Sequence, residues 1–549
     1  MIDLWYKDAV IYSLDVETFQ DSNGDGIGDF RGLTERLDYL SSLGVTCLWL
    51  LPIHPTPNLD NGYDVQDYYA VDSRLGTLGD FVELMHQARE RGMRVMLDLV
   101  VNHTSTQHPW FQAARRSKDS LYHGFYVWSD TLPSNAREGM VFPGYQDAVW
   151  TWDEEAKAYY FHRFYAHQPD LDISNPAVRE EICRIMGFWL ELGVSGFRLD
   201  AAPFLIEMKG AGAVGEDQYA YLREFRDFLS WRRGDAILLA EANVERGKMS
   251  QYFGAGVGEG ARLHMLFSFL VNQHFFLALA RQQAEPLVRG LGMLPPLPPA
   301  GQWANFVRNH DELDLGRLTP GEREEIAGQF APDPGMWLYE RGIRRRLPPM
   351  LGGDRRRIEL AYSLMFSLPG TPVLRYGEEI GMGDDLSRPE RESVRTVMQW
   401  SREPHGGFST ASELPRPAIA EGTFGYLSGV NVEEQHRDPG SLLHWMGRLI
   451  TTRKQCPELG WGSCEILENG DPAVFAHRCD WSGGTVLAVH NLADRPASIR
   501  LPWKAGDREP MVELLGDRPN ETLERDREIE LQPYGYRWFR IGGARRFLF

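Results

Sequence analysis

The chain has 549 residues, 43% of them apolar and 25% charged, and its 58 Lys and Arg stand against 77 Asp and Glu for a formal charge of −19. This composition is typical of a globular protein of more than one domain and excludes a disordered or fibrous chain. The acidic balance argues against nucleic acid or an anionic membrane as the main partner, because both attract basic surfaces.

The five cysteines are odd in number and lack CxxC spacing; they are Cys47, Cys183, Cys456, Cys464 and Cys479. The N-terminal stretch MIDLWYKDAV lacks the basic and then apolar pattern of a secretory signal. No apolar run approaches the ~20 residues that cross a bilayer. We therefore expect a soluble protein of the reducing cytoplasm that has no membrane partner.

Eight apolar runs of strand length follow one another along the chain, and most are continuous, as for strands buried on both faces of a parallel sheet. They span residues 9–16, 45–53, 94–101, 196–201, 236–242, 263–269, 303–309 and 371–377. Stretches with helical periodicity, each closed by a glycine, lie between them, as at 33–44, 78–92 and 175–193. This alternation predicts an α/β fold, a (β/α)₈ TIM barrel.

Two further domains are expected. The gap between the third and fourth runs is about twice as long as an ordinary connection and is rich in aromatic residues, which predicts an inserted domain over 105–180 and leaves 1–104 and 181–449 to the barrel. After about residue 450, short alternating runs with turn signals predict a C-terminal antiparallel β-sandwich over 450–549. Its exposed edges could join copies into a homo-oligomer, although no residue fixes a surface.

Polar residues end several of the predicted barrel strands, where barrel enzymes carry their chemistry. They are Asp98, Asn102 and His103 after the third strand, Arg198 and Asp200 on the fourth, Glu241 after the fifth, and Arg308, Asn309, His310 and Asp311 after the seventh. Three carboxylates, Asp200, Glu241 and Asp311, are expected to converge on one mouth.

Two carboxyl groups in one pocket, one ionised and one protonated, form the nucleophile and acid of a retaining glycosidase. Arg198 lies two residues before Asp200 and faces the same side, so it is expected to lower the pKa of Asp200. This predicts Asp200 as the nucleophile and Glu241 as the acid/base. A single carboxylate at a strand end is more often a helix cap or part of a surface ion pair, but three on strands four, five and seven are harder to explain in that way.

The stretch DSNGDGIGD, residues 21–29, has the spacing of half a calcium-binding loop. Asp21, Asn23 and Asp25 stand at the first, third and fifth positions, Ile27 offers a carbonyl at the seventh, and Asp29 stands at the ninth. The twelfth position holds Gly32 where an EF-hand has a bidentate Glu. Taken alone, the stretch is explained equally well as a structural turn.

The segments around strands three, four, five and seven, in this order, resemble the conserved regions of the α-amylase superfamily, and the inserted and C-terminal domains resemble its domains B and C. The resemblance covers essentially the whole chain. It implies that Asp200 is the nucleophile, Glu241 the acid/base and Asp311 the residue that orients the bound glucose. By the same resemblance, the pocket for the non-reducing glucose would be lined by Tyr63, Asp64, His103, Arg198 and His310.

QPDLD, residues 168–172, resembles the marker of the isomaltase-like branch, and DSNGDGIGDF, LLAEAN, RNHDEL and YGEEIGMGD are most similar to the trehalose synthases of that branch. Those enzymes interconvert maltose and trehalose. The implied mechanism is intramolecular: Asp200 takes the glucosyl group, and the freed glucose turns in a closed pocket and attacks through another hydroxyl. VRTVMQW, residues 394–400, is similar to a family segment with Pro in place of Val397, and its Arg395 would help to close the acceptor side. The branch holds structural Ca²⁺ in a loop that matches Asp21, Asn23, Asp25, Ile27 and Asp29.

Two departures keep other reactions open. Glu17 stands where the family usually has a basic residue, and residues 201–222 lack the Asn- and Glu-rich loop expected over the acceptor glucose. The first alternative is an α-glucosidase or transglucosidase acting on maltose or trehalose. The second is a sugar-binding barrel without catalysis, against which the intact set of three carboxylates argues.

Overall fold

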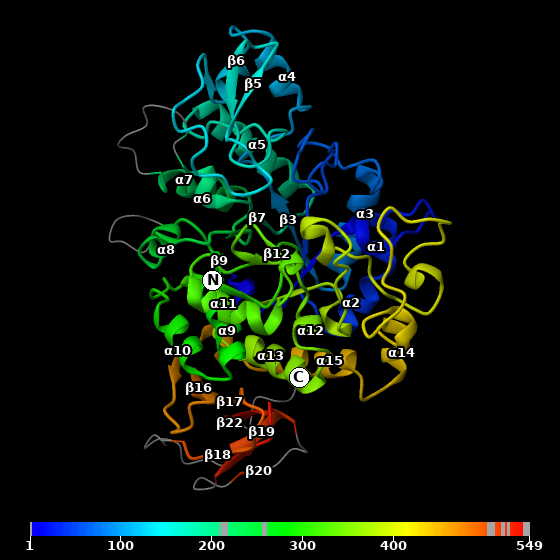
Figure 1. Ribbon diagram of the computed structural model, residues 1–549, viewed down its shortest axis with the longest axis vertical. Coiled ribbons are helices and arrows are strands. Elements are labelled where there is room, and N and C mark those ends of the chain that lie inside the picture. Colours follow the sequence, from blue (N-terminus) through cyan, green and yellow to red (C-terminus); the bar gives the residue numbers. More distant parts are fainter. Residues whose placement is uncertain are drawn as a thin grey trace.

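The computed structural model describes residues 3–207, 209, 218–254, 261–501, 511–517, 522–523 and 528–541. Eight parallel strands close into a barrel in the order β1-β14-β10-β9-β8-β7-β3-β2 (Figure 1). They are β1 (Ile11–Leu14), β2 (Cys47–Leu50), β3 (Arg94–Leu99), β7 (Gly196–Leu199), β8 (Ile237–Ala240), β9 (Met265–Phe267), β10 (Gln302–Phe306) and β14 (Thr371–Arg375). Each overlaps one of the eight predicted runs, so the predicted barrel is confirmed.

The continuous apolar pattern of these strands reflects burial on both of their faces. Along β2, Cys47 and Trp49 point into a cluster that fills the barrel, whereas Leu48 and Leu50 join the larger cluster beneath the helices. Successive side chains of a strand point to opposite faces, so a strand with two buried faces needs apolar residues at every position.

Helices surround the barrel and end where the glycine pattern predicts. α2 (Leu37–Leu43) closes at Gly44, whose φ is +97°, and Gly193, with φ +100°, follows α5 (Pro176–Glu191). The predicted helix over 33–44 is divided at Arg36, and α1 (Phe30–Glu35) precedes the break. The other long helices around the barrel are α3 (Leu78–Glu90), α7 (Ala220–Arg232), α8 (Arg246–Phe253), α9 (Phe269–Arg281), α10 (Glu285–Gly292), α13 (Arg355–Ser367) and α15 (Leu442–Lys454).

The segment between β3 and β7 forms a separate lobe, at the top of Figure 1. It holds α4 (Pro109–Arg116) and a three-stranded antiparallel sheet in the order β4 (Trp128–Ser129), β6 (Ala158–Phe161), β5 (Trp150–Asp153). Aromatic side chains pack around the sheet, as where the rings of Phe111 and Tyr160 lie 5.1 Å apart. The lobe lies within the span predicted for the inserted domain and is called domain B below.

A second excursion, between β10 and β14, was not predicted. It contains α11 (Pro320–Phe330), α12 (Leu347–Met350) and a small sheet in the order β11 (Leu313–Asp314), β13 (Gly342–Ile343), β12 (Trp337–Leu338). Arg341 donates a hydrogen bond of 2.8 Å from Nη1 to the carbonyl of Val141 in domain B. The rings of Tyr339 and Phe142 lie 4.6 Å apart. Two segments distant in sequence therefore meet.

The C-terminal part consists of antiparallel sheets, as predicted. Six strands follow the order β15 (Ser463–Ile466), β16 (Val474–Trp481), β17 (Gly484–Asn491), β22 (Tyr536–Ile541), β19 (Met511–Gly516), β20 (Thr522–Leu523). A second sheet pairs β18 (Ala497–Ile499) with β21 (Ile529–Leu531). Leu487 of the first sheet and Ile499 of the second share one apolar cluster, so the two sheets pack together as a sandwich.

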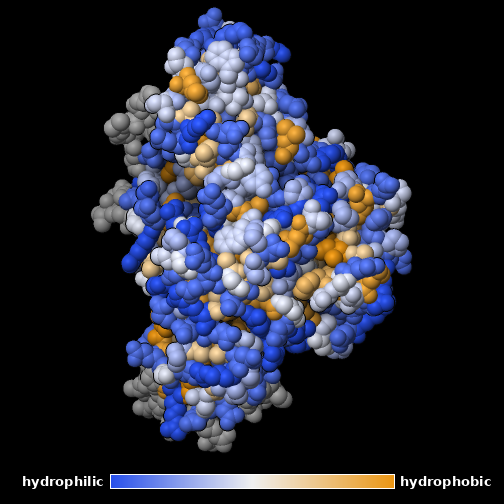
Figure 2. All heavy atoms as spheres, viewed as in Figure 1, coloured by the Kyte–Doolittle hydropathy of each residue, from blue (hydrophilic) through white to orange (hydrophobic). Residues whose placement is uncertain are grey.

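Figure 2 shows a predominantly hydrophilic surface with scattered apolar residues, as is usual for a globular chain. Within the described part of the chain, no helix combines the length and the apolar character needed to cross a membrane.

Candidate active site

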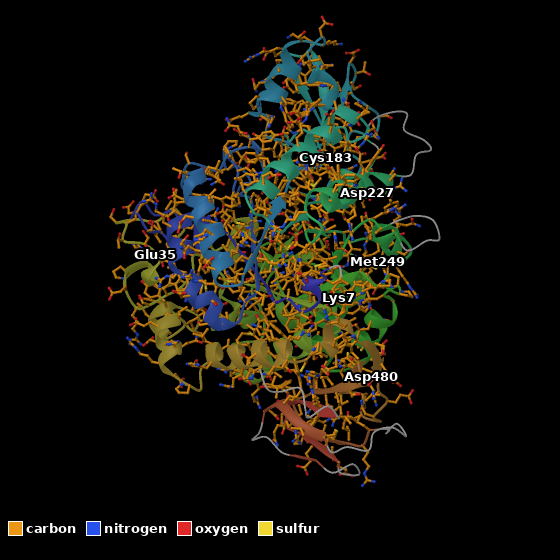
Figure 3. All side chains as sticks on the ribbon, turned by 180° about the vertical axis from the view of Figure 1, so that it is seen from behind. Lys7, Glu35, Cys183, Asp227, Met249 and Asp480 are labelled. Carbon is orange, nitrogen blue, oxygen red and sulfur yellow. The ribbon has the colours of Figure 1, made fainter. Side chains whose placement is uncertain are left out.

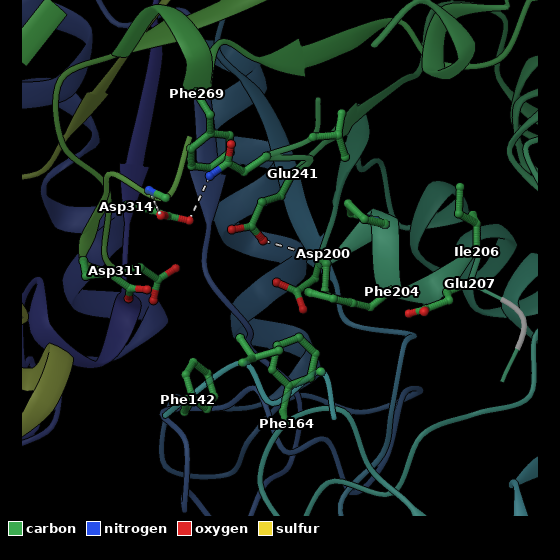
Figure 4. A pocket seen from close by; sticks show the side chains of 18 of the residues that line it. Phe142, Phe164, Asp200, Phe204, Ile206, Glu207, Glu241, Phe269, Asp311 and Asp314 are labelled. Atoms are coloured by element: carbon green, nitrogen blue, oxygen red, sulfur yellow. Dashed lines mark hydrogen bonds between the residues drawn. The ribbon is translucent and has the colours of Figure 1, made fainter. Parts of the chain in front are cut away.

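One buried arginine brings three carboxylates together above the C-terminal ends of the strands. Arg198 Nη1 donates to Asp98 Oδ1 at 2.6 Å and to Asp200 Oδ1 at 2.5 Å, and its Nη2 donates to Glu241 Oε2 at 2.5 Å. In Figure 4, the carboxyl groups of Asp200 and Glu241 approach each other, and Asp311 stands across the cavity from them. The structure thus places around one cavity the three carboxylates that were expected to converge, Asp200, Glu241 and Asp311.

The pKa values of Asp200 and Glu241 are both raised, to about 7. Burial is the main cause at each group; Arg198 acts in the opposite direction, and the charge of Asp311 reinforces the rise at both. The predicted lowering of the Asp200 pKa is wrong in its net direction, because burial outweighs the attraction of Arg198. One proton shared by this pair near neutral pH leaves one carboxyl protonated and the other ionised.

Asp311 behaves differently because it has its own cations. Its Oδ1 accepts hydrogen bonds from Arg391 Nη1 at 3.0 Å and Arg395 Nη2 at 2.9 Å, and its Oδ2 lies 3.0 Å from His310 Nε2. Burial acts to raise the pKa of Asp311, but its partners hold that pKa well below the usual range. Burial lowers the pKa of His310 to about 4, so at pH 7 its ring is neutral and the two arginines provide the positive charge.

Tyr63 connects the carboxylates that Arg198 binds with the surroundings of Asp311. Its hydroxyl donates to Asp98 Oδ2 at 2.9 Å and lies 2.7 Å from His310 Nε2, and the Tyr63 and His310 rings are stacked at 5.4 Å. His103 Nε2 lies 2.8 Å from the Tyr63 carbonyl. The three residues therefore form one rigid hydrogen-bonded wall.

A cavity of about 700 Å³ opens above the carboxylates, a size suited to a small organic ligand. Its lining combines acids and aromatic rings and includes Asp60, Tyr63, His103, Phe142, Phe164, Asp200, Phe204, Glu241, Phe269, Asp311 and Arg391. Figure 4 shows Phe142 and Phe164 facing the acidic residues from the domain B side. Such a mixture of apolar rings and hydrogen-bonding groups suits a sugar, which has both apolar faces and hydroxyl edges.

Four residues predicted to bind substrate lie outside this lining. Asp64 is fully buried, and its carboxylate accepts hydrogen bonds from the Thr56 hydroxyl and from the N–H groups of Leu59 and Asp60. Arg198, His310 and Arg395 are each no more than 2% exposed. Arg395 donates to the His310 carbonyl and to Asp311, so it supports the loop of Asp311 from below.

The prediction missed Asp60 and Arg391. Arg391 Nη2 donates to Asp60 Oδ1 at 2.7 Å while its Nη1 binds Asp311. The Gln168 side chain donates to Asp60 Oδ2 at 3.0 Å. Asp60 stands four positions before Asp64, and Arg391 stands four positions before Arg395. Each could have been found only by extending the motif that contains Asp64 or Arg395 toward the N-terminus.

Near strand three, a lysine occupies a position suited to a cation. Lys209 Nζ lies 2.8 Å from Asp170 Oδ2, 2.8 Å from Asn102 Oδ1 and 3.1 Å from the Leu171 carbonyl. Three oxygen acceptors satisfy the three donors of an ammonium group. Of residues 201–222, the segment that lacks the Asn- and Glu-rich loop expected from the resemblance, residues 208 and 210–217 lie outside the described residues.

The other departure, Glu17, is paired with cations. Its carboxylate lies 3.3 Å from Arg74 and 3.6 Å from Arg416. Two arginines thus compensate the acid that stands in place of a basic residue.

The loop 21–29 is a closed turn. Asp21 accepts hydrogen bonds from the N–H groups of Asn23, Gly24 and Gly26, and Gly24 and Gly26 have φ of +80° and +89°. Asp29 caps α1 through the Gly32 N–H. Gly24 lies against Thr410, where a Cβ would approach Oγ1 to 2.8 Å, so the loop clips the first strand to a segment after β14.

These residues fit the type of site that Ca²⁺ prefers, with oxygen donors on a rigid turn. Asn23 and Asp25 each accept one backbone N–H, which leaves lone pairs on their oxygens, and Ile27 contributes a carbonyl. No cluster of three or more His, Cys, Asp or Glu side chains in the described ranges is placed to bind a metal, and this loop would depend instead on an amide and a carbonyl. Calcium stays a prediction.

A parallel barrel whose strands four and five present two facing carboxylates beneath a cavity defines a glycoside-processing enzyme. The family profile described as "Alpha amylase, catalytic domain" matches residues 12–317 and 341–462, and "Sucrose hydrolase-like, C-terminal domain" matches 483–540. The chain belongs to the alpha-amylase family.

Similar proteins include the trehalose synthase of Pimelobacter sp. (strain R48), 42% identical over 98% of this chain and 96% of its own length. The trehalose synthase/amylase TreS of Mycolicibacterium smegmatis is 41% identical over 98% of this chain and 92% of its own. Among solved structures, the trehalulose synthase MutB from Pseudomonas mesoacidophila has a TM-score of 0.76 at 26% identity and covers 98% of this chain and 99% of its own.

Proposed function

We propose that the protein is a trehalose synthase-like isomerase that interconverts maltose and trehalose. The observation that carries the proposal is that the guanidinium of Arg198 donates hydrogen bonds to both Asp200 and Glu241 beneath the cavity. This arrangement is called the Arg198 hub below. Relatives at 40–42% identity over 98% of this chain carry the name trehalose synthase, which supports it.

The proposed reaction has two displacements. Glu241 gives its proton to the glycosidic oxygen while Asp200 attacks the anomeric carbon, so a glucosyl-aspartate forms and glucose is freed. Glu241, now ionised, accepts a proton from another hydroxyl of that glucose, which attacks and releases Asp200 with retention. Pairing of both carboxyls with Arg198 supports this reading, because a retaining enzyme needs them close together.

Isomerisation without hydrolysis needs a closed pocket. A roof formed by Phe142, Tyr165, Tyr339 and Glu390 supports this step. The Tyr165 and Tyr339 hydroxyls both donate to Glu390 Oε2, at 2.7 and 2.6 Å, and the Phe142 ring lies against both tyrosines. The roof joins domain B to the excursion after β10, and Phe142 also lines the cavity.

Incubation with maltose tests the proposal. Trehalose is expected as the main product, with glucose as a minor one, and both can be resolved by anion-exchange chromatography. Glucose as the main product would favour the second candidate, an α-glucosidase or transglucosidase. That candidate is supported by relatives named oligo-1,6-glucosidase, such as that of Bacillus cereus at 30% identity. No turnover of maltose or trehalose would favour a binding barrel.

The proposed function includes a structural calcium ion on the 21–29 loop and a small neutral α-glucoside as the ligand. The proposed setting is the reducing cytoplasm, which is supported by the five cysteines, all free in the structure.

A further inference from the structure

Two cysteines face each other in the C-terminal sheet, away from the barrel cavity. In the antiparallel pair of β15 and β16, Cys464 lies directly opposite Cys479. Opposite residues of such a pair have Cα atoms about 4.5–5.5 Å apart and side chains on the same face. A disulfide spans Cα separations of about 4.4–6.8 Å, so the backbone already has the required spacing.

The two thiols differ in access. Cys464 is exposed on the edge strand of the sheet, whereas Cys479 is buried. A hydrogen bond with Cys464, together with burial, raises the pKa of the Cys479 thiol well above its usual value. One sulfur can therefore meet a reagent from solvent, and the other is in contact with the first but shielded from the reagent.

We propose that Cys464 and Cys479 form a modification site that closes to a disulfide when the protein meets a low-molecular-weight disulfide. The Cys464 thiolate attacks the reagent's S–S bond and releases one thiol, which leaves a mixed disulfide on Cys464. The Cys479 sulfur then attacks Cys464 Sγ and expels the second thiolate, which takes up the proton of the Cys479 thiol and leaves as a thiol. Two cysteines are oxidised, and one reagent molecule is reduced to two thiols.

The site lies where the barrel meets the C-terminal sheet. Just before β15, Trp461 Nε1 donates to Asp8 Oδ2 at 2.7 Å, and Glu458 lies 3.1 Å from Arg540 Nη2 on β22. A covalent bond between β15 and β16 would fasten the free edge of the sheet beside these contacts and restrict the unfolded chain between the two cysteines. We expect the oxidised protein to unfold about 2 °C higher than the reduced protein.

The experiment exposes the reduced full-length protein to oxidised glutathione, with intact-mass and non-reducing peptide analysis. The wild type is expected to lose the mass of two hydrogens and to yield one linked peptide containing Cys464 and Cys479. Thiol titration of the denatured, oxidised protein should then find three free thiols, whereas the reduced protein has five. The variant C479S should stop at the mixed disulfide and gain one glutathionyl group on Cys464.

C183S is the matched control. Cys183 is partly exposed on α5, and Figure 3 places it well away from Asp480, the chain neighbour of Cys479. This variant should form the same linked peptide as the wild type. The proposal is overturned if the wild type stops at a glutathionyl adduct on Cys464, or if Cys464 does not react at all.

Discussion

Arg375 donates a hydrogen bond of 2.8 Å from Nη1 to the backbone carbonyl of Asn309. The next two carbonyls have the same kind of partner: Arg395 Nε donates to His310 at 2.9 Å, and Arg308 Nη2 donates to Asp311 at 2.6 Å. Three buried arginines thus hold three successive carbonyls of the loop that carries Asp311. The backbone of this loop is therefore held from behind, by arginines that do not line the cavity.

Replacing Arg375 with Gln should lower kcat for maltose about 10-fold, with little change in KM. The change leaves the Asn309 carbonyl without its buried donor, which costs on the order of 1–3 kcal/mol and lets the Asp311 loop shift. Steady-state assays of trehalose formation would measure it. Arg356→Gln is the control, because Arg356 is an exposed arginine paired with Asp354. Equal kcat in both variants would contradict the positioning role.

Replacing Asp200 with Asn should abolish the nucleophile and reduce kcat by on the order of 10⁴-fold. The same variant should be more stable than the wild type at neutral pH. The pKa of Asp200 rises from about 4 in the unfolded chain to about 7 in the folded protein, so the folded form binds more protons in this window and its stability falls as pH rises through it. Asparagine has no such titration.

Thermal unfolding of Asp200→Asn and wild type across pH 4 to 8 would test the sign of this effect. The variant's advantage in Tm should be largest above pH 7 and should close as the pH approaches 4. Asp172→Asn is a control at a carboxylate outside the cluster. A Tm difference that does not vary with pH would show that Asp200 titrates normally.

Opening the roof should shift the product from trehalose toward glucose. Glu390→Gln removes the charge that accepts both tyrosine hydroxyls, and Tyr339→Phe removes one of the donors. Both Tyr339 and Glu390 have positive φ, of 53° and 40°, so the closed arrangement is strained and depends on these contacts. The share of glucose in the product should rise about 2- to 5-fold, because water reaches the glucosyl intermediate.

Tyr145→Phe is the matched control for the roof. Tyr145 is 52% exposed and its ring lies 5.5 Å from Tyr339, so the change removes a hydroxyl at the outer side of the same cluster. The ratio of glucose to trehalose should be that of the wild type. A ratio that is unchanged in Glu390→Gln as well would exclude the roof as the barrier to water.

The barrel and the catalytic carboxylates could be predicted because their signals are local. Trp49 and Leu50 are adjacent in sequence and buried on opposite faces, which produces a continuous apolar run, and Asp200 comes directly after Leu199, the last residue of β7. The roof could not be predicted, because Tyr165 and Glu390 meet across 225 positions of the sequence. The pKa of Asp200 was predicted in the wrong direction because Arg198 is visible two residues away, whereas the depth of burial is not.

Chelation of calcium should lower the Tm and leave the pH profile of activity unchanged. The 21–29 loop clips β1 to the segment after β14, and the Arg198 hub makes no direct contact with it, so an ion there would add stability without adding charge at Asp200 or Glu241. We expect EGTA to lower the Tm by about 3–8 °C, as loss of a ligand bound only by the folded state does, and excess Ca²⁺ to restore it.

Two variants separate the loss of a calcium ligand from the loss of a surface charge. Asp25→Asn removes the negative charge of one predicted calcium ligand at an exposed position of the loop. The Tm of this variant should be insensitive to EGTA. Asp67→Asn is the matched control, because Asp67 is also exposed and its carboxylate accepts a backbone N–H two residues further on, as that of Asp25 does. It should keep the wild-type response. If EGTA leaves the wild-type Tm unchanged, the hydrogen bonds that Asp21 accepts within the loop are sufficient for its stability, and the loop is a turn without a metal.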